Sequence, residues 1–353
     1  MKLIDLGWHD RWAALLAAVE IPALIPGRVT RAERGLVTVV TEAGEVSATL
    51  AGSLHTDGEP GPAAVGDWVG IDFSGGGEVV RVILPRTGAL SRRRPGGGER
   101  EQVAAANVDQ VLVVESVERG PNPRRIERAV ALAYDGGASP AVILTKIDLC
   151  EDLEAAEQKA RGGAPFCDVH LISAVEGTGL EEVASRLHAG STSVLLGPSG
   201  VGKSTLTNAL LGEERFAVSG VREGDYKGRH TTTHRELVVL PSGACLIDTP
   251  GIRELGLWLD SEAVGAAFPE IEELALDCRF GDCRHETEPG CAVLEAVEDG
   301  GLDPARLDSY LRLRREAENL DLRRDTTRQY EIRARERSFG KMVKEAVKYK
   351  KDR

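Results

Sequence analysis

The sequence predicts three consecutive folded units: a small N-terminal β-barrel, a central α/β domain with a phosphate-binding loop, and a mostly helical C-terminal domain that binds zinc. Short β-type runs separated by Gly- and Pro-rich turns predict the first unit. Apolar strands that alternate with helical stretches predict the second. A cluster of Cys and His residues predicts the third. The length of 353 residues fits two or three domains.

The N-terminal part is predicted to contain a helix over residues 1–26 and an OB-fold barrel over residues 27–85. Short β-type runs lie at 35–41, 45–50, 67–72 and 78–84. Strands this short and this evenly spaced favour a closed barrel. Such barrels often bind oligonucleotides, but this segment is net acidic, which argues against phosphate binding by it. Residues 86–102, which contain arginines and glycines, are predicted as a linker.

Charge is distributed unevenly along the chain. The net charge is −12, but the basic tail predicted at residues 310–353 has 15 Lys and Arg against 8 Asp and Glu. This asymmetry indicates either contact with a polyanion or a solvated helix rich in both signs. No run of about 18 apolar residues and no secretory signal is present. We therefore expect a cytoplasmic monomer with no membrane partner.

A phosphate-binding loop is the most specific motif in the α/β domain predicted at residues 103–260. Residues 197–204 match G-x-x-x-x-G-K-[ST] in full, after an apolar strand and before a helix. Backbone N–H groups of such a loop cradle phosphates, Lys203 adds positive charge, and Ser204 offers a hydroxyl to Mg²⁺. The predicted nucleotide contacts of the loop are Gly197, Pro198, Ser199, Gly200, Val201, Gly202, Lys203, Ser204 and Thr205.

Two further motifs point to the γ-phosphate and Mg²⁺. Asp248-Thr-Pro-Gly251 follows an apolar strand, so Asp248 is expected to hold Mg²⁺ and the N–H of Gly251 to reach the γ-phosphate. Between this motif and the phosphate loop lies a polar segment, 227–235, which is the expected switch region. Thr233, or else Thr232, is expected to close on Mg²⁺. A surface loop with incidental hydroxyls is the alternative.

A base-reading motif precedes the phosphate loop. Thr145, Lys146 and Asp148 form T-K-x-D at the end of an apolar strand, as in the guanine-reading motif of GTPases. Asp148 can accept hydrogen bonds from N1–H and N2–H₂ of guanine, which adenine does not offer. Lys146 is expected over the base and sugar, and Ser173-Ala174 near the guanine carbonyl. In ordinary GTPases these motifs follow the phosphate loop, so the sequence predicts a circularly permuted GTPase domain.

A zinc-binding domain is predicted at residues 261–309. Its potential ligands fall within 14 residues and are Cys278, Cys283, His285 and Cys291. Three thiolates and one imidazole suit tetrahedral Zn²⁺ and leave no position for water, so one structural ion is expected. Free buried thiols are the alternative, and His230 or His234 could replace His285 in principle.

Together these motifs resemble the RsgA/YjeQ family, the GTPases that depend on the small ribosomal subunit. The likeness includes residues 26–29, 65–69 and 105–109 in addition to the nucleotide and zinc motifs. It implies a GTPase that uses GTP and Mg²⁺, is stimulated by the small ribosomal subunit and acts in its late maturation. It also implies that the barrel and the zinc domain contact ribosomal RNA.

The sequence offers several candidates for the group that orients the attacking water. Ile252 follows the Asp-Thr-Pro-Gly motif where Ras-like enzymes carry a Gln, so slow intrinsic hydrolysis is expected. The candidates for the missing group are His230, His234 and a ribosomal group. The main hypothesis is an enzyme that uses Lys203 and an ordered switch loop. The alternatives are a binding module for which GTP sets domain orientation, and a GTPase that acts on another RNA or on a membrane.

Overall fold

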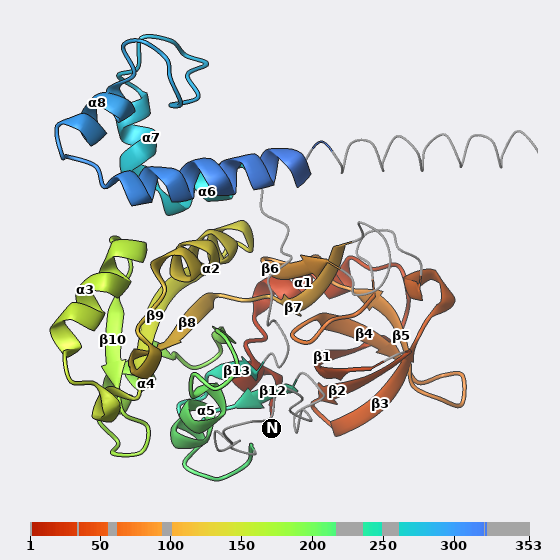
Figure 1. Cartoon of the computed structure of the whole chain (residues 1–353). Helices are drawn as coiled ribbons and strands as arrows, with labels where there is room; N and C mark the ends of the chain where they lie inside the picture. Colours follow the sequence, from red (N-terminus) through yellow and green to blue (C-terminus); the bar gives the residue numbers. More distant parts are fainter. Residues whose placement is uncertain are drawn as a thin grey trace, which may run out of the picture.

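The computed structural model describes residues 2–33, 35–55, 62–93, 101–216, 236–248, 261–320 and 322. Figure 1 shows a barrel beside an α/β domain, and a helical C-terminal unit placed over helix α2 of that domain. Among these residues, no helix has the length and apolar character needed to span a membrane.

The N-terminal unit is a five-stranded barrel preceded by two short helices. Its elements are η1 (Leu3–Leu6), α1 (Asp10–Ala17), β1 (Ile25–Ala32), β2 (Leu36–Thr41), β3 (Gly44–Leu50), η2 (Gly52–His55), β4 (Trp68–Asp72) and β5 (Val79–Ile83). The strands follow the order β1-β2-β3-β5-β4, and β4 pairs back onto β1 to close the barrel. Buried valines and Ile71 fill its core.

The helices in front of the barrel are shorter than the sequence predicts. The helix expected over residues 1–26 covers only α1 and the single turn η1, and β1 begins at Ile25. The rings of Trp8 and Trp12 pack on Trp68 of the barrel, with centroid distances of 4.9 and 6.1 Å. Aromatic packing of this kind fixes the N-terminal segment to the barrel.

The α/β domain, which the sequence predicts to be the GTPase domain, is built on a sheet with the strand order β10-β9-β8-β11-β13-β12. Its strands are β8 (Gln110–Ser116), β9 (Ser139–Thr145), β10 (Val169–Ile172), β11 (Thr192–Leu196), β12 (Glu236–Val239) and β13 (Cys245–Asp248). Its helices are α2 (Pro123–Asp135), α3 (Leu153–Gly163), α4 (Leu180–Arg186) and α5 (Lys203–Leu211), with the short turns η3 (Val117–Arg119) and η4 (Ile147–Leu149). All neighbouring strands are parallel except β12 and β13, and most are buried on both faces, as expected for such a sheet.

The barrel and the GTPase sheet are joined by strand pairing. Strand β1 pairs with β12 at Arg31 and Glu236, so one sheet of 11 strands runs through both units. Next to this junction, β6 (Ala89–Arg93) and β7 (Glu101–Ala106) form an antiparallel hairpin. Within the described residues, the predicted linker at 86–102 forms strand β6 and the start of β7, and the buried Leu90 and Ala105 anchor these two strands.

The C-terminal unit is helical. It contains α6 (Ser261–Ala267), α7 (Pro269–Ala275), α8 (Ala292–Glu298) and a helix over residues 304–320. Phe268, Ile271, Val293 and Leu313 are buried between these helices. The predicted start of the basic tail at residue 310 falls inside the last helix, and residues 323–353 lie outside the described part of the chain.

Candidate functional site

The phosphate loop connects β11 to α5 at the centre of the GTPase sheet. A Cβ atom at Gly197 would lie 2.2 Å from the carbonyl oxygen of Val114, so this position requires glycine. Gly202, at the N-terminus of α5, has a φ of +98°, which also favours glycine. The Nζ of Lys203 donates to the carbonyl oxygens of Gly197 and Pro198, at 2.8 Å each. The loop therefore has a compact form at the start of a helix, where the helix dipole favours an anion.

The structure brings the base-reading motif into contact with the phosphate loop. The Oγ1 of Thr145, at the end of β9, donates to the carbonyl oxygen of Val201 at 2.5 Å. It also lies 3.2 Å from the carbonyl oxygen of Glu115, at the end of β8. Thr145 is buried, so this contact is shielded from water. Residues 56 positions apart in the chain thus form the two sides of one site.

Lys146 is held in an unusual backbone conformation. Its φ is +63°, a left-handed value that is uncommon for a residue other than glycine and that often marks a functional site. Its Nζ pairs with Glu118 at 2.5 Å, and this hydrogen bond lowers the pKa of Glu118 below its usual range. Asp148 follows in the turn η4, where its side chain is exposed and therefore accessible to a ligand.

The second segment predicted to read the base, Ser173-Ala174, directly follows the neighbouring strand, β10. The N–H of Ser173 donates to the carbonyl oxygen of Thr178 at 3.1 Å, and its Oγ accepts from the N–H of Glu176 at 3.2 Å. These bonds form a tight turn with Ser173 buried and Ala174 half-buried. Because β9 and β10 are parallel neighbours, this turn and Asp148 lie at the same edge of the sheet.

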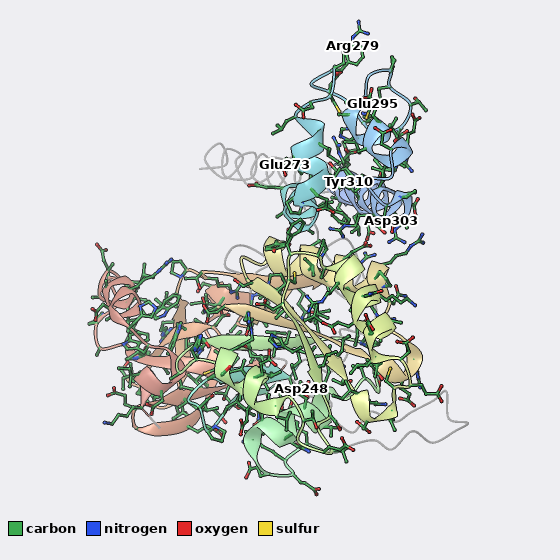
Figure 2. All side chains as sticks on the ribbon, turned by 90° about the vertical axis from the view of Figure 1, so that its left-hand side faces the viewer. Asp248, Glu273, Arg279, Glu295, Asp303 and Tyr310 are labelled. Carbon is green, nitrogen blue, oxygen red and sulfur yellow. The ribbon has the colours of Figure 1, made fainter. Side chains whose placement is uncertain are left out.

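Asp248 ends β13, the strand next to β11. It is paired in register with Leu195, two residues before Gly197. Burial raises the pKa of Asp248, and the positive charge of Lys203 opposes this rise. Figure 2 shows Asp248 within the GTPase domain, far from the labelled residues of the C-terminal unit. A carboxylate and the Ser204 hydroxyl are the hard oxygen donors that suit Mg²⁺, so these residues fit the ion.

Several predicted site residues lie outside the described residues. They are Thr232, Thr233, His230, His234, Gly251 and Ile252. The third Mg²⁺ ligand and the group that orients water therefore stay predictions from the sequence.

The Cys/His cluster is assembled in the C-terminal unit. The ligand atoms of Cys278, Cys283, His285 and Cys291 all lie within 4.8 Å of one another. The Nδ1 of His285 is 3.6 Å from the Sγ of Cys278 and 3.4 Å from that of Cys291. Ligands around a tetrahedral Zn²⁺ lie about 3.4–3.8 Å apart, given Zn–S of about 2.3 Å and Zn–N of about 2.0 Å. Burial also lowers the pKa of His285, which keeps its imidazole neutral as a ligand must be.

A buried arginine, which the sequence analysis included in the motif at residues 26–29 but gave no role, connects the barrel to the strand that enters the phosphate loop. Arg28 is 1% exposed, and its NH2 donates to the Oγ1 of Thr192, the first residue of β11, at 2.7 Å. It also donates to the carbonyl oxygens of Leu6 and Gly66, and its guanidinium lies 4.9 Å from the ring centre of Trp68. Four consecutive residues of β1, 27–30, are buried, and Arg28 is the charged residue among them, which is an uncommon place for an arginine.

Comparison with known proteins gives the family. The chain matches the RsgA GTPase family over residues 83–258. It is 44% identical to the small ribosomal subunit biogenesis GTPase RsgA of Syntrophotalea carbinolica, and 93% of each chain is covered. It is 43% identical to the protein of that name from Streptomyces coelicolor, over 99% of this chain and 96% of the relative. The chain belongs to the RsgA GTPase family. The resemblance inferred from the motifs is thereby confirmed, and the protein is a GTPase.

Solved structures of RsgA-type proteins agree with the fold. The crystal structure of YjeQ from Thermotoga maritima is 28% identical with a TM-score of 0.64, and covers 83% of this chain and 98% of that one. The structure of YloQ, described as a circularly permuted GTPase, is 26% identical with a TM-score of 0.60, and covers 85% of this chain and 97% of that one. The predicted fold class, a barrel followed by a permuted GTPase domain and a helical C-terminal unit, is confirmed.

Proposed function

We propose that the protein hydrolyses GTP during late maturation of the small ribosomal subunit, and that the subunit stimulates this hydrolysis. The observation that supports this most is the coverage of the relatives. Proteins named small ribosomal subunit biogenesis GTPase RsgA match the barrel and the C-terminal unit as well as the GTPase domain. The protein acts as a monomer in the cytoplasm, and its barrel, zinc domain and basic tail contact ribosomal RNA.

Recognition of guanine is assigned to residues on β9, β10 and the turns that follow them. Asp148 accepts hydrogen bonds from N1–H and N2–H₂ of the base, while Lys146 lies over the base and sugar. Ser173 and Ala174 form the turn that faces the guanine carbonyl. The contact between Thr145 and the phosphate loop supports this assignment, because it fixes the distance between the base and the phosphates.

Phosphate binding and hydrolysis are assigned to the loop and to the polar residues around it. Backbone N–H groups of residues 197–205 hold the phosphates, and Lys203 neutralises charge that develops during transfer to water. Ser204, Asp248 and Thr233 hold Mg²⁺, which supplies further neutralisation of the phosphate oxygens. The N–H of Gly251 binds the γ-phosphate. His230 orients the attacking water once contact with the subunit has ordered segment 227–235.

The Cys/His cluster is assigned to one structural Zn²⁺. Four protein ligands fill a tetrahedral site, so no position is available for water or substrate. Cys291 is the N-cap residue directly before α8, while Cys278 follows α7, so the ligand set connects these two helices. A small helical unit of this kind gains much of its folding free energy from such an ion.

The direct test is GTP turnover with and without purified small ribosomal subunits. We expect saturating subunits to raise the rate by about tenfold or more, because an ordered switch group supplies much of the transition-state stabilisation in phosphoryl transfer. The Lys203→Ala variant is the matched control and should hydrolyse GTP neither with nor without the subunits. Turnover that does not change at saturating subunits would contradict the proposal and leave GTP as a ligand that sets domain orientation.

A further inference from the structure

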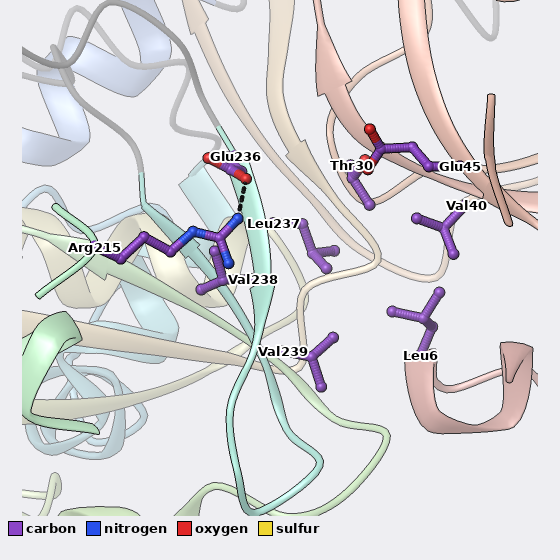
Figure 3. Close-up of a pocket in the computed structure, with 9 residues that line it drawn as sticks. All are labelled: Leu6, Thr30, Val40, Glu45, Arg215, Glu236, Leu237, Val238 and Val239. Atoms are coloured by element: carbon purple, nitrogen blue, oxygen red, sulfur yellow. Dashed lines mark hydrogen bonds and ion pairs between the residues drawn. The ribbon is translucent and has the colours of Figure 1, made fainter. Parts of the chain in front are cut away.

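One carboxylate at the junction of the barrel and the GTPase sheet contacts both units. Glu236, the first residue of β12, accepts hydrogen bonds on the same oxygen, Oε1, from two arginines. The NH2 of Arg31, on barrel strand β1, lies 2.6 Å away, and the NH2 of Arg215 lies 2.5 Å away. Figure 3 shows the contact between Arg215 and Glu236 at the edge of a cavity that also borders η1 and the barrel.

Glu236 also belongs to a row of residues that crosses the sheet. In this row Arg31 is paired with Glu236, Glu236 with Asp248, and Asp248 with Leu195. The row therefore runs from the barrel through the predicted Mg²⁺ ligand to the strand that enters the phosphate loop. Paired strands are stiff along such a row, because each backbone is hydrogen-bonded to the next. A displacement of Asp248 is thus coupled to the barrel over two strand spacings.

Arg215 is fixed to the phosphate-loop helix by Asn208, a buried residue of α5. The Oδ1 of Asn208 accepts from the N–H groups of Arg215 and Phe216, at 3.2 and 2.8 Å. Its Nδ2 donates to the carbonyl oxygen of Phe216 at 2.8 Å. Arg215 consequently follows α5, while Arg31 follows the barrel, and Glu236 joins them. In the sequence, the segment predicted as the switch region lies between Arg215 and Glu236.

The energetic contribution of these ion pairs to folding is small. The side chain of Arg31 is 42% exposed and that of Glu236 is 19% exposed. Ion pairs with this degree of exposure stabilise a fold by about 0.2–1 kcal/mol. The arrangement therefore serves geometry more than stability, since it defines where β12 lies relative to both α5 and the barrel.

We propose that Glu236 is a positioning residue of the GTPase, which couples the nucleotide state at the phosphate loop and Asp248 to the position of barrel strand β1. It does so through Arg215 on the nucleotide side and Arg31 on the barrel side. A coupling of this kind works in both directions, so a partner that binds the barrel also affects the nucleotide site. The effect of a barrel-binding partner on the nucleotide site rests on the proposed function, whereas the response of β1 to the nucleotide does not.

The first test measures hydrogen exchange in the peptide that covers β1, with Mg²⁺ and either GDP or a non-hydrolysable GTP analogue. In the unchanged protein, exchange in β1 should differ between the two nucleotides. In the Glu236→Gln and Arg31→Met variants, at least half of that difference should be lost. The matched control is Arg81→Met, which removes another barrel ion pair, to Asp72, with exposures of 42% and 20%.

This hydrogen-exchange experiment tests the inference without ribosomal subunits. If β1 shows no nucleotide-dependent exchange, or if Arg31→Met keeps the full difference as Arg81→Met does, the inference is wrong. If Arg31→Met and Arg81→Met lose the same thermal stability but only Arg31→Met loses the exchange difference, a merely structural role of Arg31 is excluded.

The second test measures turnover. Arg31→Met should retain basal GTP hydrolysis and the KM for GTP, while the subunit-stimulated rate falls about fivefold, the lower end of usual coupling strengths. Adding Arg215→Met should reduce stimulation no further, because both arginines act through one carboxylate. Equal stimulated rates for Arg31→Met and Arg81→Met would overturn the role in catalysis. If the unchanged protein is not stimulated while the exchange result is as expected, the proposed function fails and the coupling stands.

Discussion

The GTPase domain is attached to its two neighbours in different ways. The barrel continues the GTPase sheet through the pairing of β1 with β12, and the buried side chain of Arg28 extends from β1 to the start of β11. The C-terminal unit is instead held by side chains between α2 and the helix over 304–320. At the centre of that interface, Arg306 is 6% exposed and donates to Glu127, Glu270 and the carbonyl oxygen of Ala267.

This difference indicates what each attachment can do. Backbone pairing fixes direction and register, so the barrel is suited to pass on small displacements of the sheet. Across the C-terminal interface, the buried Arg306 pairs with Glu127, and the more exposed pairs Arg128 with Glu316 and Arg124 with Asp308 lie beside it. Buried charge pairs contribute little net stability but are costly to break on one side. The C-terminal unit should therefore be the easier of the two to release.

The largest expected effect comes from Arg306→Met. This change leaves the carboxylate of Glu127 buried without its cation, which costs about 3–5 kcal/mol of unfolding free energy in comparable cases. Denaturant unfolding with hydrogen exchange should locate the loss in α6–α8 and spare the barrel. Adding Glu127→Gln should restore part of the loss, because it removes the unpaired charge. A loss below about 1 kcal/mol would contradict this description of the interface.

Arg28→Met should destabilise the other attachment by about 2–3 kcal/mol. It removes the donor from the carbonyl oxygen of Leu6 and from the hydroxyl of Thr192, whereas the carbonyl oxygen of Gly66 keeps its hydrogen bond from Asn107. A buried unsatisfied group costs about 1–3 kcal/mol. The control is Arg11→Met, at an exposed arginine that lies 5.6 Å from the ring centre of Trp12 in the same aromatic cluster. Thermal or urea unfolding measures both. Equal stabilities of the two variants would show that Arg28 does not hold this junction.

Asp248→Asn should stabilise the nucleotide-free protein while it abolishes Mg²⁺-dependent turnover. Burial raises the pKa of Asp248 in the folded state, so ionisation opposes folding. The stability that the carboxyl contributes is present below its unfolded pKa of about 3.9 and is lost as pH rises through the folded pKa.

The Asp248→Asn variant has no carboxyl to ionise and so avoids this loss of stability. Its free energy of unfolding should be about 1 kcal/mol higher at pH 7. The gain should shrink as the pH approaches 4. Unfolding curves at several pH values measure this, and a variant less stable than the unchanged protein at pH 7 would contradict it.

The smallest effect is expected for Arg124→Met, at the edge of the C-terminal interface. Its side chain is 56% exposed and that of Asp308 is 63% exposed, so the pair should contribute less than about 1 kcal/mol. Raising the salt concentration should remove even this difference between the variant and the unchanged protein. A larger and salt-independent loss would mean that the interface is distributed and does not depend mainly on Arg306.

The sequence was sufficient where the relevant residues are close together in the chain. Each of three motifs occupies a short segment: the phosphate loop, the T-K-x-D motif and the Cys/His cluster. The residue types and their spacing within the segment were enough to predict the ligand of each motif. The strands of the parallel sheet were predicted because they are buried on both faces and therefore apolar throughout.

Other features could not be predicted because they depend on distant pairings. Strand β1 contains Pro26 and Gly27, which locally favour a turn, and its pairing with β2 and β4 overrides that preference. Strand β12 has only four residues and follows a long polar segment. Arg28 meets Thr192 from 164 positions away, and Arg306 meets Glu127 from 179 positions away. No spacing rule connects residues so far apart.

The central claim is that the phosphate loop and Asp148, from earlier in the chain, bind one guanine nucleotide. Isothermal titration with non-hydrolysable GTP and ATP analogues tests it, on the unchanged protein and on Asp148→Asn. We expect a preference for the guanine nucleotide of about 10⁴-fold, because adenine leaves the carboxylate without donors, and a large loss of that preference in the variant. Equal affinities for the two nucleotides, or an unchanged preference in Asp148→Asn, would contradict the account.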